Sequence, residues 1–136
     1  MAYIRKQTEI DAPADEVWAA LSDWGALHER LVPGFVVDTR LDGEDRIVTF
    51  FNGAVVREVP VARDDEERRL AWSIVDGPYT HHNGAAQVFD EGGGRSRFVW
   101  IADLLPDELA AQTAEMMERG VQVISETLSA SRRAGV

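Results

Sequence analysis

The chain has 136 residues, of which 45% are hydrophobic and 28% are charged, the balance of an ordinary globular domain. Its 24 acidic residues against 14 Lys and Arg give a net charge of −10, which argues against nucleic acid as a partner. The absence of cysteine excludes disulfides and thiolate chemistry. Because no signal-like segment or long apolar run is present, we expect a cytoplasmic protein without membrane insertion.

The first 34 residues predict one strand followed by two short helices. Residues 3–10 alternate between apolar and polar side chains, as a strand does. Asp11 or Ala12 is expected to cap the first helix, with Pro13 in its first turn. A second short helix is expected over 26–31, ended by the Pro-Gly pair at 33–34.

The middle of the chain predicts consecutive strands joined by tight turns. Turn signals such as Asp42-Gly43, Asn52-Gly53 and the glycines at 92–94 predict hairpins, so neighbouring strands should pair antiparallel. Pro60 predicts a bulge within its strand. The expected strands are 35–41, 45–51, 54–63, 69–76, 79–90 and 95–104.

The chain closes on a long amphipathic helix, expected from about Pro106 to Ser131. One antiparallel sheet and one helix with a matching apolar stripe predict an α+β fold, a curved seven-stranded sheet wrapped around this helix, in a single domain over 1–136. The stripe consists of Leu109, Thr113, Met116, Met117, Gly120, Val121, Ile124 and Leu128.

The strand 79–90 places small side chains where a core needs large ones. Its inward face carries His82, Gly84 and Ala86, and aromatic residues are expected on both neighbouring strands. This pattern predicts an internal cavity, and the alternative is that Trp72 and Trp100 fill the space. Gly120 in the long helix indicates either close backbone approach or open room.

Three stretches of the chain carry a family resemblance: 10–18, the region from Glu58 to the turn at 64–70, and Phe98-Val99-Trp100 leading to Leu105-Pro106. With the order of elements, they make the chain resemble the START-like, Bet v 1-like (SRPBCC) superfamily, and within it the bacterial polyketide cyclase/dehydrase-like group. The resemblance implies a helix-grip fold with a deep pocket between sheet and C-terminal helix. Members bind lipids, sterols, hormones or polyketides and some are enzymes, so the resemblance implies no particular ligand.

The first functional hypothesis is sequestration or transport of a small hydrophobic molecule, such as a lipid, a polyketide or an aromatic compound. Glu58 and His82 would be its polar anchor. The expected pocket walls are Trp72, Ile74, Gly84, Ala86, Phe98, Trp100, Met117, Val121, Trp24 and Leu27.

The second hypothesis is a cyclase/dehydrase-type enzyme in which His82 and Glu58 act as acid and base from backbones roughly 10 Å apart. The competing interpretation is that Glu58 faces solvent or pairs with Arg57 or Arg97. A third hypothesis is a protein-interaction module that docks a partner through the groove or the second helix. Adjacent His81 and His82 point to opposite faces of a strand and cannot hold one ion together, so we expect no metal and no cofactor.

Overall fold

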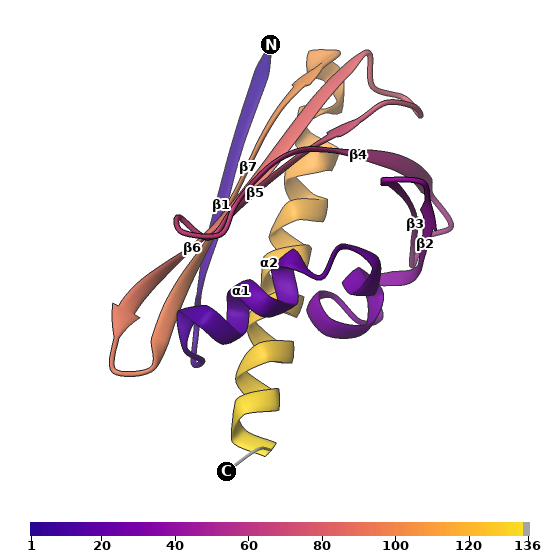
Figure 1. The fold of residues 1–136 in the computed structure, drawn as a ribbon. Coiled ribbons are helices and arrows are strands. Elements are labelled where there is room, and N and C mark those ends of the chain that lie inside the picture. The colour runs from indigo at the N-terminus through magenta and orange to yellow at the C-terminus, as the bar shows by residue number, and fades with distance from the viewer. Residues whose placement is uncertain (135–136) are drawn as a thin grey trace.

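The computed structural model describes residues 1–134 and contains one curved sheet in the order β1-β7-β6-β5-β4-β3-β2, with all neighbours antiparallel (Figure 1). This confirms the predicted seven-stranded antiparallel sheet. The strands are β1 (Ala2–Ile10), β2 (Val36–Asp42), β3 (Asp45–Phe50), β4 (Val55–Asp64), β5 (Arg69–Ile74), β6 (His81–Gly92) and β7 (Arg95–Leu105).

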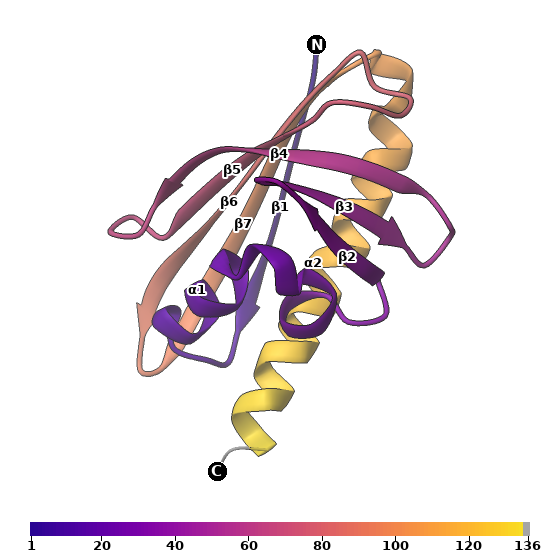
Figure 2. The same cartoon turned by 45° about the vertical axis from the view of Figure 1, so that its right-hand side comes forward.

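The concave face of the sheet partly encloses the long helix, and the short helices cover the same side (Figures 1 and 2). The first helix begins after Pro13, which is its N-cap without a side-chain hydrogen bond, so the predicted capping by Asp11 or Ala12 is wrong. The helices are α1 (Ala14–Ser22), the 3₁₀ turn η1 (Trp24–Ala26), the π-helical turn η2 (Leu27–Leu31), the 3₁₀ turn η3 (Asp107–Leu109) and α2 (Ala110–Ala134).

The irregularity predicted at Pro60 is present. The β4–β5 register shifts between Pro60 and Ala62, because proline cannot donate a ladder hydrogen bond. The strand bends there, and its first half, which carries Val56 and Glu58, keeps those side chains on the buried concave face.

The core lies between this concave face and the helices. Val121 and Ile124 of α2 pack in one cluster with Phe98 of β7 and Val17 of α1. A smaller cluster around Leu104 and Met117 closes the other end. No helix in the described part of the chain is long and apolar enough to cross a membrane.

Candidate functional site: two cavities between the sheet and α2

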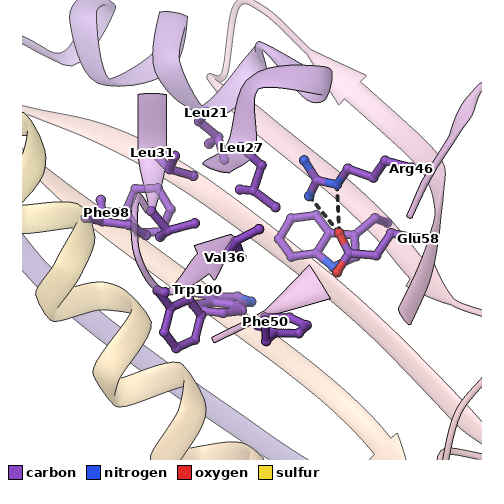
Figure 3. Close-up of a pocket in the computed structure, with 13 residues that line it drawn as sticks. Leu21, Leu27, Leu31, Val36, Arg46, Phe50, Glu58, Phe98 and Trp100 are labelled. Carbon is purple, nitrogen blue, oxygen red and sulfur yellow. Dashed lines mark hydrogen bonds and ion pairs between the residues drawn. The ribbon is translucent and has the colours of Figure 1, made fainter. Parts of the chain in front are cut away.

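The interior contains two adjacent cavities, which we name by the charged or titratable residue particular to each. The His82 cavity has a volume of about 150 Å³ and lies between β4–β7 and the first half of α2. The Arg46 cavity has a volume of about 60 Å³ and lies beneath α1 and η2 (Figure 3). Five residues line both cavities and form the wall between them: Phe35, Phe50, Glu58, Trp72 and Trp100.

Gly84 and Gly120, on the interior face, each lie directly against a tryptophan ring. A Cβ atom on Gly84 would lie 2.7 Å from the ring of Trp72, and one on Gly120 would lie 2.7 Å from the ring of Trp100. The two rings are tilted by 50° with centroids 6.4 Å apart. The predicted open space beside Gly84 is therefore filled by Trp72, and Gly120 provides close approach rather than room. The cavities lie beside the rings instead.

The Arg46 cavity is bordered by a buried ion pair. Arg46 of β3 lies opposite Glu58 of β4 in the sheet, and the two residues are only 4% and 6% exposed. Nε of Arg46 donates to Oε1 of Glu58 at 2.8 Å, Nη2 forms an ion pair with the same oxygen at 2.7 Å, and Nη1 donates to the carbonyl oxygen of Trp24 at 3.1 Å. Figure 3 shows both side chains at the edge of the cavity.

This pairing replaces the partners considered from sequence. Glu58 faces neither solvent nor Arg57 or Arg97, because Arg57 binds Asp42 and Asp45 and Arg97 binds Glu91. Burial lowers the pKa of Arg46, and the charge of Glu58 and its hydrogen bond oppose that shift. The guanidinium also lies 3.7 Å from the centroid of the Trp24 ring, a cation–π contact.

His82 is the buried polar group of the other cavity. It is 5% exposed, and its ring meets the ring of Tyr79 edge to face with centroids 4.7 Å apart. Its Nδ1 atom has no hydrogen-bond partner among the described residues. Burial lowers the pKa of His82 to about 4, against smaller opposing effects of its own backbone and of Asp103. The imidazole is therefore neutral at pH 7.

Glu58, Ile74 and His82 form one row across three strands. Glu58 pairs with Ile74 between β4 and β5, and the β5–β6 register, which pairs Trp72 with Gly84, brings Ile74 level with His82. Two strand spacings separate the backbones of Glu58 and His82 by about 10 Å. All three residues line the His82 cavity, so the two polar groups flank an apolar floor without touching each other.

The rim of the His82 cavity is tied to α2. The hydroxyls of Tyr79 and Thr113 are 2.7 Å apart, which joins the β5–β6 loop to the helix. Outside the residues that line this cavity, the guanidinium of Arg119 lies 4.1 Å from the centroid of the Phe51 ring, in the β3–β4 turn. His81 points to the outer face, where its Nε2 lies 2.6 Å from Oδ2 of Asp103.

Comparison with protein-family models gives one match, over residues 1–131, to the model described as polyketide cyclase / dehydrase and lipid transport. The chain belongs to this family. No curated protein shows significant sequence similarity to the chain. The match agrees with the resemblance seen in the sequence and with the observed fold.

Several solved structures share the fold of this family member. A protein from Thermobifida fusca, solved in solution by NMR, is 27% identical with a TM-score of 0.76, and the match covers 97% of this chain and 93% of that one. A START superfamily protein from Mycobacterium smegmatis is 11% identical with a TM-score of 0.75, covering 98% and 99%. Norcoclaurine synthase from Thalictrum flavum, crystallised with dopamine and hydroxybenzaldehyde, is 17% identical with a TM-score of 0.72, covering 98% and 87%.

Some of the predicted pocket residues line one or both cavities, and others line neither. Those that line a cavity are Trp72 and Trp100 (both cavities), Ile74, Met117 and His82 (His82 cavity), Phe98 and Leu27 (Arg46 cavity) and Glu58 (both). Gly84, Ala86 and Val121 are buried but lie outside the walls of these two cavities. Trp24 covers the Arg46 guanidinium, and Trp24 and Leu27 are partly buried against the core.

Sequence reasoning missed Arg46, Phe35 and Phe50. Phe35 and Phe50 line both cavities and meet edge to face with ring centroids 5.6 Å apart. A signal was available for Phe50, since the alternation of 45–50 places it on the same strand face as Val48. The same alternation includes Arg46, but arginine in a strand is ordinarily a solvent-facing residue, which works against an inward assignment.

Proposed function

We propose that this protein binds a small hydrophobic ligand in the His82 cavity and sequesters or carries it. The observation that carries the proposal is the cavity itself, about 150 Å³ between the sheet and α2. Protein interiors are close-packed and unfilled space lowers stability, so a void of this size beside tryptophan rings is most simply explained by an occupant.

The walls suit an adaptable apolar ligand. Met116 and Met117 contribute flexible, polarisable thioethers from α2, and Trp72 and Trp100 contribute flat aromatic surface from the sheet. The family description, which includes lipid transport, supports the proposal. Norcoclaurine synthase has the same fold and was crystallised with two aromatic molecules, dopamine and hydroxybenzaldehyde, which also supports the proposal.

Filling the cavity tests the proposal. Ile74→Phe adds bulk to the cavity floor, and Val75→Phe adds the same ring at an exposed neighbouring position on the opposite face. Titration with toluene, followed by amide chemical shifts, and with the larger fluorescent probe N-phenyl-1-naphthylamine is expected to show binding of at least one probe, which Ile74→Phe weakens and Val75→Phe leaves unchanged. Equal binding by both variants, or binding of neither probe by the wild type, would contradict a ligand site here.

An enzyme of the cyclase/dehydrase kind is the second candidate, favoured by one observation: His82 and Glu58 border the same cavity. The details favour binding over acid–base chemistry. The carboxylate of Glu58 is already held by Arg46 through one hydrogen bond and an ion pair, and an imidazole whose pKa is lowered to about 4 is a weak general base near pH 7. Turnover of a polyketide-like substrate that His82→Ala abolishes would reverse this preference.

A further inference from the structure

We infer that the ligand of the His82 cavity is a single-ring aromatic molecule bearing a neutral hydrogen-bond donor, of the phenol class, and that the cavity selects against carboxylates. This inference rests on the proposed function and names its ligand chemistry. Three features of the cavity carry it: its volume, the free acceptor on Glu58, and the neutral unpartnered imidazole of His82.

The volume sets the number of rings. An apolar cavity of about 150 Å³ is the size that holds one benzene ring. The His82 cavity has that volume, and the wall formed by Trp72, Trp100 and their neighbours separates it from the Arg46 cavity of about 60 Å³. One substituted ring therefore fills the space as it stands, whereas a sterol or a fused polyketide would extend past the exposed rim at Asn52 and Gln112 or displace the tryptophan wall.

The Glu58 end of the cavity is an acceptor. Its Oε1 accepts a hydrogen bond from Nε of Arg46 and lies 2.7 Å from Nη2, whereas Oε2 has no hydrogen-bond partner among the described residues. Glu58 lines the cavity and Oε2 is not one of the buried unpartnered atoms, so this second oxygen is an accessible acceptor for a ligand N–H or O–H. A hydroxyl that donates to a carboxylate forms a charge-assisted hydrogen bond, among the stronger kinds.

The same end disfavours anions. All three nitrogens of the Arg46 guanidinium are occupied, by Glu58 and by the carbonyl oxygen of Trp24. No Lys or Arg is among the residues that line the His82 cavity. A ligand carboxylate would thus be buried beside a carboxylate without a cation to pair with, which is costly in a low-dielectric interior.

An ammonium group fits less well than a hydroxyl. Arg46 and Glu58 already neutralise each other, so a cationic ligand would introduce an uncompensated buried charge. The neutral imidazole of His82 stands at the far end of the row, beyond Ile74, and offers Nδ1 to a second polar substituent. A ring lying over Ile74 would direct one edge toward Glu58 and the other toward His82.

Matched probes test the inference on the unaltered protein. The full chain is titrated at pH 7.5 with 4-methylphenol, 4-methylanisole, toluene and 4-methylbenzoate, and dissociation constants are read from amide chemical shifts. We expect 4-methylphenol to bind about tenfold tighter than toluene or 4-methylanisole, the ratio that one charge-assisted hydrogen bond supports. We expect 4-methylbenzoate to bind more weakly than toluene.

Two variants assign the preference to Glu58. The double variant Arg46→Met with Glu58→Leu removes the ion pair together and should keep toluene binding while abolishing the preference for 4-methylphenol. His81→Gln, on the outer face, should leave the whole order unchanged. Retention of the phenol preference in the double variant would overturn the assignment.

The outcomes separate this inference from the proposed function. If toluene binds as tightly as 4-methylphenol, or 4-methylbenzoate binds as tightly as toluene, the polar selectivity is overturned while hydrophobic binding stands. If no single-ring probe binds but N-phenyl-1-naphthylamine does, the size inference is overturned and the proposed function stands. If neither kind of probe binds, both are overturned.

Discussion

The Arg46–Glu58 pair and His82 are both buried on the concave face of one sheet, yet they differ in how far their polar atoms are bonded within the protein. Each nitrogen of the Arg46 guanidinium has a hydrogen-bond or ion-pair partner, and a tryptophan ring covers its face. Nδ1 of His82 has no partner in the described residues, and its ring borders the larger cavity. Buried polar groups are ordinarily satisfied within the protein.

The contrast separates a structural role from a binding role. The ion pair joins β3 to β4, and the Nη1 hydrogen bond of Arg46 joins it to the short helical turn that contains Trp24. An unsatisfied imidazole beside a cavity leaves a hydrogen-bonding group available to an occupant. Glu58 belongs to both categories, because one of its oxygens is bonded and the other is not.

Removing one member of the ion pair is expected to cause the largest loss of stability. Arg46→Met leaves the Glu58 carboxylate buried without its cation, and we expect the free energy of unfolding to fall by about 3–5 kcal/mol. Glu58→Leu should be comparably damaging, since it leaves the guanidinium unpaired. Urea unfolding monitored by circular dichroism measures both variants.

The double variant is the control for that prediction. Replacing both charges by apolar side chains leaves no isolated charge, so Arg46→Met with Glu58→Leu should be more stable than either single variant. Strictly additive losses would show that the two side chains are not coupled, and the ion pair would lose its structural role in the comparison.

The fold could be predicted because its determinants are local. Alternation predicted the inward faces of β5, β6 and β7, turn residues predicted the hairpins, and the spacing of apolar residues in 109–128 predicted the buried face of α2. Even Pro60 marked its bulge, because the missing N–H is a property of the residue itself.

Arg46 was missed because it depends on pairing between strands. Read as a two-residue loop, Asn52-Gly53 would place Arg46 opposite Val59. In the structure the loop spans 51–53, with the amide of Phe50 bonded to the carbonyl of Ala54, and the register moves by one residue. Because opposed residues share a face, this shift brings Arg46 and Glu58 to the same buried side.

The glycines were ambiguous for a similar reason. A small residue inside a sheet can leave a void or can seat a large ring, and the choice depends on the side-chain rotamers of Trp72 and Trp100. Those rotamers follow from the complete packing of sheet and helix rather than from any local pattern. The sequence therefore predicted a cavity but misplaced it by the width of one ring.

Substituting Gly84 tests how firmly Trp72 is held in the wall between the two cavities. Gly84→Ala would place a methyl group 2.7–2.9 Å from three atoms of the rigid Trp72 ring, so the ring must shift. Overpacking of this kind costs about 1–3 kcal/mol in unfolding free energy. Gly25→Ala is the matched control, because its new methyl would meet only the flexible tip of Leu41, at 3.2 Å. If both variants are equally stable, Trp72 is not held against Gly84.

Acidification tests the His82 end of the comparison. The pKa of His82 is lowered from 6.5 to about 4 in the folded protein. The unfolded chain therefore takes up the proton first, so the stabilising effect of neutral His82 is complete above pH 6.5 and is lost as the pH falls toward 4. Between pH 7.5 and pH 5 the linkage amounts to about 2 kcal/mol.

Urea unfolding at the two pH values measures that loss. His82→Leu cannot titrate, so its stability should fall by about 2 kcal/mol less than that of the wild type over the same interval. His81→Gln changes only the outer-face imidazole and should retain the wild-type loss due to His82.

Bound 4-methylphenol should further stabilise the wild type at pH 7.5, since a ligand that binds only the folded state raises its stability. Identical acid sensitivity in the wild type and His82→Leu would mean that the imidazole is hydrated in the folded state, and the distinction between the bonded ion pair and the unsatisfied histidine would no longer hold.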